Sequence, residues 1–176
     1  MFPGGKGLNQ SIAAASAGAL VYHAGCIGYD GQMLEDILTS SGVDVTYLKK
    51  VDKKNGHAII QVDKTGENCI FLYKGSNEMI TEDFVDEVIS NFEKGDIILL
   101  QNEINNLEYI IKTAHKKGMQ IVLNPSPFNE NLKAIDLDMI TYLILNRIEG
   151  QSFVSKDSPE SFLQYMKKNH PTVKVV

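Results

Sequence analysis

Apolar residues along the chain follow two alternating periods, which predict β-strands and α-helices in turn. Segments rich in apolar residues predict strands at 20–27, 96–100, 120–123, 140–145 and 173–176. Apolar residues spaced three or four apart predict helices at 9–17 and between the pairs Asp30 and Gly42, Thr81 and Gly95, Asn106 and Gly118, and Ser158 and Pro171. Strands that alternate with helices predict an α/β fold with a mostly parallel sheet and right-handed crossovers.

A different pattern lies between the first two α/β repeats and the rest of the chain. Short strand-like runs occur at 45–51, 57–63 and 68–73, and residues 64–67 form a good hairpin loop between the last two. We therefore expect a small antiparallel sheet over residues 43–75, standing off an α/β body made of residues 1–42 and 76–176.

Local signals fix several of the expected boundaries. Asp30 and Thr81 are the residue types that cap helix amino termini, and Gly118 is typical of a position just past a helix carboxyl terminus. The run at 97–100 is apolar at every position, which predicts a strand covered on both faces.

The amino terminus carries the most distinctive polar motif, Gly-Gly-Lys-Gly-Leu-Asn-Gln at residues 4–10. Glycine allows any φ and leaves no Cβ in the way, so the backbone can approach a ligand closely. The following helix would present its N–H groups and positive dipole end to the same place. Lys6 and Asn9 add side-chain donors, which suits a ligand covered with hydroxyl groups. The alternative is a tight turn before a helix.

Other polar residues follow the predicted strands at their carboxyl ends. Glu103, Asn124 and Asn146 each come just after such a strand, and ligands of parallel α/β sheets bind beyond these ends. Glu103 could instead be a solvated loop acid or cap the next helix, and Asn146 could cap the helix that contains Glu149.

Taken in order, the motifs at 4–10, 101–103, 124–127 and 146–149 resemble the signatures of the ribokinase-like (PfkB-type) carbohydrate kinases, and the similarity covers essentially the whole chain. The resemblance implies a three-layer α/β/α body, here incomplete, with the small antiparallel sheet acting as a lid over a sugar. It also implies that ATP and Mg²⁺ serve the complete enzyme as cofactors.

The resemblance also assigns roles to residues. It implies that Gly5, Lys6, Asn9 and Glu103 bind the sugar, that Asn146 contacts nucleotide phosphates, and that Glu149 orders magnesium-bound water. The segment at residues 4–10 favours ribose over the fructose and adenosine of related family members.

The family's catalytic base lies in an Asp-Thr-x-Gly-Ala-Gly-Asp-like run, and these 176 residues contain no such run. We therefore expect no catalytic residue in this chain and no kinase activity from it alone. A different class stays open, namely a non-catalytic remnant that binds sugar or has only a structural role.

Composition and charge limit the classes of partner that we expect for this protein. The net charge of −5, without long runs of one sign, argues against nucleic acid or an anionic membrane as the main partner. No apolar run reaches the roughly 18 residues of a spanning helix, and no signal peptide is visible, so we expect a cytoplasmic protein. Cys26 and Cys69 fit reduced core cysteines. We expect a homodimer, formed through the lid or through an exposed sheet edge.

Overall fold

The computed structural model describes residues 2–154 and 159–176. The chain forms two compact units, Met1–Ile80 and Thr81–Val176, here called the amino-terminal and carboxyl-terminal units. The strands form two parallel sheets and one antiparallel hairpin, so the α/β fold with a small antiparallel sheet is confirmed.

The amino-terminal unit contains three helical segments and four strands within its described residues: α1 (Lys6–Ser16), β1 (Gly25–Ile27), α2 (Gln32–Ser40), β2 (Leu48–Lys50), β3 (His57–Val62), β4 (Asn68–Tyr73) and the 3-10 helix η1 (Gly75–Glu78). Its core is a cluster around Leu8, Leu38 and Val43, on which Ile12 and Leu34 also pack. This cluster holds α1 against α2.

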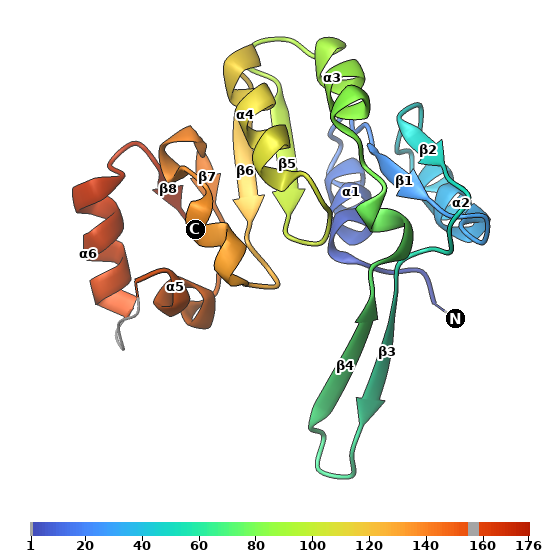
Figure 1. Ribbon diagram of the computed structural model, residues 1–176, viewed down its shortest axis with the longest axis horizontal. Coiled ribbons are helices and arrows are strands. Elements are labelled where there is room, and N and C mark those ends of the chain that lie inside the picture. Colours follow the sequence, from blue (N-terminus) through green and yellow to red (C-terminus); the bar gives the residue numbers. More distant parts are fainter. Residues whose placement is uncertain (1, 155–158) are drawn as a thin grey trace. The chain divides into compact units, whose positions relative to one another are not determined.

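The β2 strand differs from the sequence-based expectation. Residues 45–51 were expected in the antiparallel sheet, but β2 pairs in parallel with β1, with Gly25 opposite Leu48. Only β3 and β4 form the antiparallel sheet, in the register His57 opposite Tyr73. Figure 1 shows this hairpin extending away from the helices of its own unit.

The carboxyl-terminal unit continues the α/β alternation. Its elements are α3 (Glu82–Ser90), β5 (Ile97–Gln101), α4 (Leu107–Lys117), β6 (Gln120–Asn124), the 3-10 helices η2 (Glu130–Ala134) and η3 (Leu137–Met139), β7 (Tyr142–Leu143), α5 (Arg147–Val154), α6 (Pro159–Asn169) and β8 (Lys174–Val175). The strands pair in parallel in the order β5-β6-β7-β8. The expected helix start at Ser158 lies outside the described residues.

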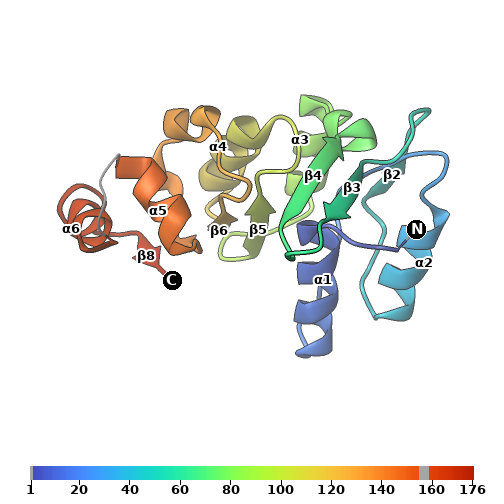
Figure 2. The same cartoon turned by 90° about the horizontal axis from the view of Figure 1, so that it is seen from below.

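One face of this sheet carries the core of the unit. Ile121 and Leu123 of β6 and Leu143 of β7 are fully buried, and Leu100 of β5 lies in register with Leu123. Helix α4 packs on β6 through its apolar face, where Ile111 is 1% exposed, and Figure 2 shows α4 on one side of β5 and β6. Burial of this face contributes apolar stabilisation to the unit.

The expectation that β5 is covered on both faces is wrong. Ile97 and Leu99 point to the face opposite Leu100 because successive residues of a strand alternate, and they are 64% and 38% exposed. The structure thus gives β5 one buried and one open face, although its sequence is apolar on both.

Two of the predicted helix boundaries are confirmed, and one is wrong. Thr81 caps α3 by accepting a hydrogen bond from Phe84 N at 3.2 Å, and Gly118 ends α4 with φ 82°, both as expected. Asp30 does not cap α2, whose N-cap residue is Gly31. Its carboxylate instead accepts a hydrogen bond from Asn55 N at 2.7 Å, far away in sequence.

Candidate functional site

The polar segment at residues 4–10 leads directly into α1. Gly5 is the N-cap residue with φ 109° and ψ 149°, a conformation that glycine adopts without strain, and no side chain caps the helix there. A Cβ at Gly4 or Gly5 would meet no atom within 4 Å, so the backbone has open space beside it. Asn9, one turn into α1, is exposed. This end of α1 therefore combines an open glycine backbone with the positive end of a helix dipole.

The carboxyl ends of β5, β6 and β7 lie side by side in the second unit. Gln101 at the end of β5 is in register with Asn124 at the end of β6. Amide side chains bridge the neighbouring strand ends: Asn102 Nδ2 donates to Pro127 O at 2.6 Å, and Asn124 Nδ2 donates to Ile144 O at 2.8 Å. Polar side chains therefore lie at the carboxyl ends of β5 and β6 in this unit.

Glu103 lies in the turn that follows β5, and its side chain is partly buried. It does not cap the next helix, because the N-cap residue of α4 is Asn106. The capping alternative for Glu103 is thereby removed, and the alternative of a solvated loop carboxylate stays open. A carboxylate offers up to four acceptor sites, which fits a ligand with several hydroxyl groups.

Asn146 and Glu149 cap each other at the start of α5. Asn146 Oδ1 accepts a hydrogen bond from Glu149 N at 3.0 Å, and Glu149 Oε2 accepts one from Asn146 N at 3.0 Å. This reciprocal pair is a capping box, built here with Asn at the N-cap position. Asn146 is exposed, whereas Glu149 is only 8% exposed. The capping role weighed for Asn146 is thus real, and any contact with a nucleotide must be made by a side chain already held in place.

A cavity of about 210 Å³ opens beside this capping box. It lies at the carboxyl ends of β7 and β8, where ligands of parallel sheets bind. Most of its lining is apolar, and the polar groups stand on one side: the lining residues are Leu145, Asn146, Arg147, Gly150, Phe162, Leu163, Val175 and Val176. A flat apolar group with an anionic tail would suit this lining.

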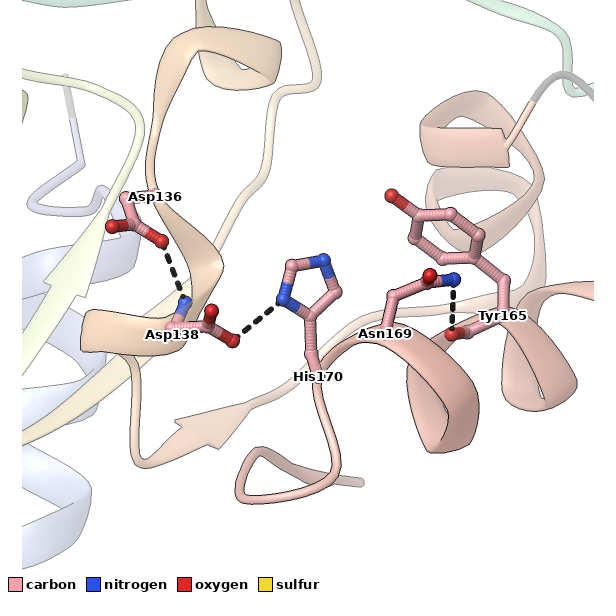
Figure 3. Close-up of polar contacts among 5 residues, drawn as sticks. All are labelled: Asp136, Asp138, Tyr165, Asn169 and His170. Atoms are coloured by element: carbon pink, nitrogen blue, oxygen red, sulfur yellow. Dashed lines mark hydrogen bonds and ion pairs between the residues drawn. The ribbon is translucent and has the colours of Figure 1, made fainter.

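A larger cavity of about 300 Å³ lies at the opposite ends of these strands, beside Asp138 and Thr141. Figure 3 shows the neighbouring contacts, in which His170 Nδ1 lies 2.7 Å from Asp138 Oδ1 and Asp136 Oδ1 accepts from Asp138 N at 3.0 Å. These contacts join η3 to the end of α6. Because this cavity is at the amino ends of the strands, we do not take it as the candidate site.

The structure also shows a contact that the sequence does not signal. Ser11 Oγ lies 2.8 Å from His23 Nδ1, although the residues are twelve apart. Burial lowers the pKa of His23 below its ordinary value of 6.5, which favours the neutral ring. The contact ties α1 to the segment before β1, and so helps to hold the helix that carries Lys6 and Asn9.

The candidate residues thus fall into two groups. Gly5, Lys6 and Asn9 belong to the amino-terminal unit, whereas Glu103, Asn146 and Glu149 belong to the carboxyl-terminal unit. Within the second unit, Glu103 and Asn146 follow β5 and β7, with β6 between them. At the usual strand spacing the strands β5 and β7 lie roughly 10 Å apart. Convergence of both groups on one pocket stays a prediction.

Residues that could hold a metal are few. In the part of the chain that the structure describes, no group of three or more His, Cys, Asp or Glu side chains is arranged to bind a metal ion. The same described residues contain no helix with the length and apolarity needed to cross a bilayer.

Comparison with known proteins gives consistent results. The family model described as pfkB family carbohydrate kinase matches residues 1–176. The Haemophilus influenzae ribokinase is 36% identical over 143 residues, which are 76% of this chain and 47% of that protein. The Bacillus subtilis ribokinase is 35% identical over 152 residues, which are 84% of this chain and 52% of that protein.

Among solved structures, the Arabidopsis thaliana ribokinase complexed with ribose and ATP is similar, with a TM-score of 0.79 and 26% identity. The similarity covers 98% of this chain and 60% of that chain. The chain spans about half the length of the Haemophilus influenzae and Bacillus subtilis ribokinases, as the shares of 47% and 52% show.

Proposed function

Because the chain belongs to the pfkB family of carbohydrate kinases, we propose that it is part of an ATP-dependent kinase that phosphorylates a hydroxymethyl group of a small sugar, ribose in the first place. The observation that supports ribose is the identity of 35% and 36% to two ribokinases over most of this chain. The Arabidopsis relative, solved with ribose and ATP, supports the same pair of ligands.

In this proposal the two units contribute different parts of the site. At the start of α1, Gly5, Lys6 and Asn9 donate hydrogen bonds to hydroxyl groups of the sugar. Glu103 accepts hydrogen bonds from hydroxyl groups of the same sugar. Polar partners of this kind, once a bound sugar shields them from water, discriminate strongly against a sugar that lacks the matching hydroxyl. The β3–β4 hairpin covers the sugar as a lid.

The nucleotide part of the proposal rests on the capping box. Asn146 contacts the phosphates, and the cavity beside it receives part of the nucleotide. Glu149 already accepts a bond from Asn146 N through Oε2, but a carboxylate can accept several more. Its position fits a contact with Mg²⁺ through a bound water, since Mg²⁺ usually keeps several waters. When bound, Mg²⁺ would offset negative charge on the phosphates.

Positioning is then the chemical task of this chain. The strand-end residues and the start of α1 orient the sugar, which lowers the entropic part of the barrier. Proton removal from the attacking hydroxyl needs a base, and the family's Gly-Ala-Gly-Asp-like run is not in this sequence. We therefore expect the isolated chain to bind sugar without turnover, because loss of a base alone costs about 10²–10⁴ in rate.

Calorimetric titration of the purified chain with ribose tests the proposal. We expect ribose to bind, and Glu103→Gln to weaken binding on the order of tenfold, since a charged hydrogen-bond acceptor becomes neutral. Glu108→Gln is the matched control, because Glu108 is an exposed residue of α4 whose carboxylate pairs with Lys112 Nζ at 2.6 Å. Equal ribose affinity in both variants would refute the role of Glu103.

A parallel assay addresses the alternatives. Fructose and adenosine are titrated beside ribose, and a coupled assay follows ATP consumption. Tighter binding of fructose or adenosine would reassign the substrate within the family. Ribose-dependent ATP consumption by the chain would refute the expected inactivity, and absence of binding by all three compounds would favour the structural remnant.

We also propose that two copies of the chain pair through the hairpin. Both hairpin faces carry exposed apolar side chains, among them Ile60 at 59% and Phe71 at 57%, and contiguous patches of this kind mark interaction sites. Ile60→Lys should convert a dimer to a monomer in sedimentation velocity. A monomeric wild type, or a dimeric Ile60→Lys variant, would contradict the proposal; the exposed edge of β8 would then be the next surface to test.

A further inference from the structure

The β3–β4 hairpin has a defined direction but little packing to define it. Its described side chains are exposed along almost the whole of both strands, including Ile59 at 57% and Leu72 at 62%. Figure 1 shows the hairpin projecting from its unit. An isolated two-stranded hairpin is marginal in water, so its orientation must be set where it joins the rest of the unit.

Asn55 lies at this junction and joins three segments. Its Oδ1 accepts a hydrogen bond from Gly28 N at 2.6 Å, in the loop just after β1. The same oxygen accepts from Ser76 Oγ at 3.3 Å, in η1 just after β4. Asn55 N donates to Asp30 Oδ1 at 2.7 Å. Asn55, two residues before β3, thus connects the incoming segment of the hairpin, its outgoing segment and the carboxyl end of β1.

The backbone segments around Asn55 are closely packed. A Cβ at Gly28 would collide with Lys53 O, and a Cβ at Gly75 would collide with Lys54 O. A Cβ at Gly56 would lie 2.7 Å from Lys74 O. Real Cβ contacts do not come this close to backbone, so the three chain segments touch backbone to backbone. These close contacts bring Asn55 within hydrogen-bond reach of both Gly28 and Ser76.

Ser76 strengthens this picture because it is only 1% exposed. Its N–H donates to Lys54 O at 3.0 Å, while its hydroxyl reaches Asn55. Truncating Asn55 would leave the Gly28 N–H and a buried hydroxyl without this acceptor. Losing an acceptor for buried donors destabilises the local arrangement more than losing an exposed contact.

We propose that Asn55 is a positioning residue that fixes the direction of the β3–β4 hairpin relative to the carboxyl end of β1, and thereby contributes to sugar affinity. The second half of this inference rests on the proposed function, in which the hairpin covers the sugar. If the hairpin holds the covering direction for only a fraction of the time, the apparent dissociation constant rises by the inverse of that fraction. Asn55 acts here through the hairpin and does not itself touch the substrate.

The direct test measures the hairpin direction in the full chain. Spin labels at Lys64→Cys in the hairpin loop and Thr39→Cys on α2, in a Cys69→Ser background, report a distance within the amino-terminal unit. Asn55→Ala should broaden the distance distribution, and Gln61→Ala should not, because Gln61 is an exposed residue of the same hairpin. A distribution for Asn55→Ala that matches Gln61→Ala would overturn the proposal.

Ribose titration of the same variants separates the two halves of the inference. We expect Asn55→Ala to weaken ribose binding on the order of tenfold relative to Gln61→Ala. A broadened distribution with unchanged ribose affinity would overturn the link to sugar binding. If even the wild type fails to bind ribose, the proposed function fails, while the distance measurement still decides the role of Asn55.

A milder variant keeps the test decisive should Asn55→Ala not fold. Ser76→Ala removes only the longer of the two bonds to Asn55 Oδ1 and leaves the bond from Gly28 N. We expect a distribution of intermediate width. A width equal to that of the wild type for Ser76→Ala, with Asn55→Ala unfolded, would show that Asn55 stabilises the unit without directing the hairpin, and would overturn the proposal.

Discussion

The capping box of α5 offers a way to separate stability from ligand binding at one pair of residues. Asn146 and Glu149 each accept a hydrogen bond from the other's backbone N–H at 3.0 Å. The perturbations are Asn146→Ala, Asn146→Ser, Glu149→Ala and Glu149→Gln. Each changes one side chain and leaves both backbone donors in place.

The expected magnitudes follow from what each variant leaves behind. Asn146→Ala removes the N-cap acceptor and should lower the free energy of unfolding by about 1 kcal/mol, whereas Asn146→Ser keeps a good N-cap and should change it by a few tenths of a kcal/mol, on the order of 0.3. Glu149→Ala should cost about 1–2 kcal/mol, because Glu149 is 8% exposed and the Asn146 N–H loses its partner. Glu149→Gln keeps an acceptor and loses only the charge near the helix dipole, about 0.5 kcal/mol.

Urea unfolding followed by circular dichroism measures these differences, and titration with Mg²⁺ and ATP measures binding. The informative variant is Glu149→Gln, which is expected to remain nearly as stable as the wild type and to bind Mg²⁺–ATP more weakly. Asn146→Ser should likewise be stable and lose contact with the phosphates.

Two results would refute this reasoning. If Glu149→Gln destabilises the chain as much as Glu149→Ala, then charge, not hydrogen bonding, holds the start of α5, and the capping interpretation fails. If both conservative variants bind Mg²⁺–ATP as well as a wild type that does bind it, the two side chains serve the helix alone.

Three further predictions concern stability. Ile111→Ala should lower the free energy of unfolding of the carboxyl-terminal unit by about 2–5 kcal/mol in urea unfolding, whereas Ile97→Ala, at a 64% exposed position, should change it by at most about 0.5 kcal/mol. Gly75→Ala should lower the free energy of unfolding by about 2 kcal/mol or more in the same assay, because φ is 53° and the new Cβ would collide with Lys54 O. Gly66→Ala is the control for backbone strain alone, because Gly66 has φ 88° but no atom within 4 Å of the new Cβ. Burial lowers the pKa of His23 below 6.5 in the folded chain. As the pH drops through 6.5, the unfolded chain therefore binds a proton before the folded chain does, and the free energy of unfolding should fall. Unfolding curves measured from pH 7.5 to 5 should show a weaker pH dependence for His23→Gln than for the wild type.

Local features of the sequence predicted the local features of the fold. The apolar stripe between Thr81 and Gly95 became the buried face of α3, where Phe84, Val85 and Ile89 lie. The hairpin was predicted with its loop, and the register of β3 and β4 agrees with it. These features depend on residues within one or two turns of each other, and such dependence is visible along a sequence.

The predictions that were wrong depend instead on residues that are distant in the sequence. The sequence indicated a strand at 45–51 but not its partner, because parallel pairing with β1 joins segments more than twenty residues apart. Asp30 has the chemistry of a helix cap, and its carboxylate is used for Asn55 N instead. An acceptor near a turn can bond to local or distant donors, and composition alone does not decide between them.

The candidate site shows why a polar residue at a strand end is an ambiguous signal. Asn124 and Asn146 were candidates by position, and Asn102 precedes the candidate Glu103; the structure gives each of these amides a bond to nearby backbone. A side-chain amide, however, has a donor group and an acceptor group. Asn124 donates from Nδ2 to Ile144 O, and its Oδ1 can accept a hydrogen bond from a ligand hydroxyl. Bonds of this kind hold an amide in one orientation before the ligand arrives, which reduces the entropy lost on binding. Structural use of these side chains is therefore compatible with the proposed sugar site, and the comparison of conservative with truncating variants distinguishes the two uses.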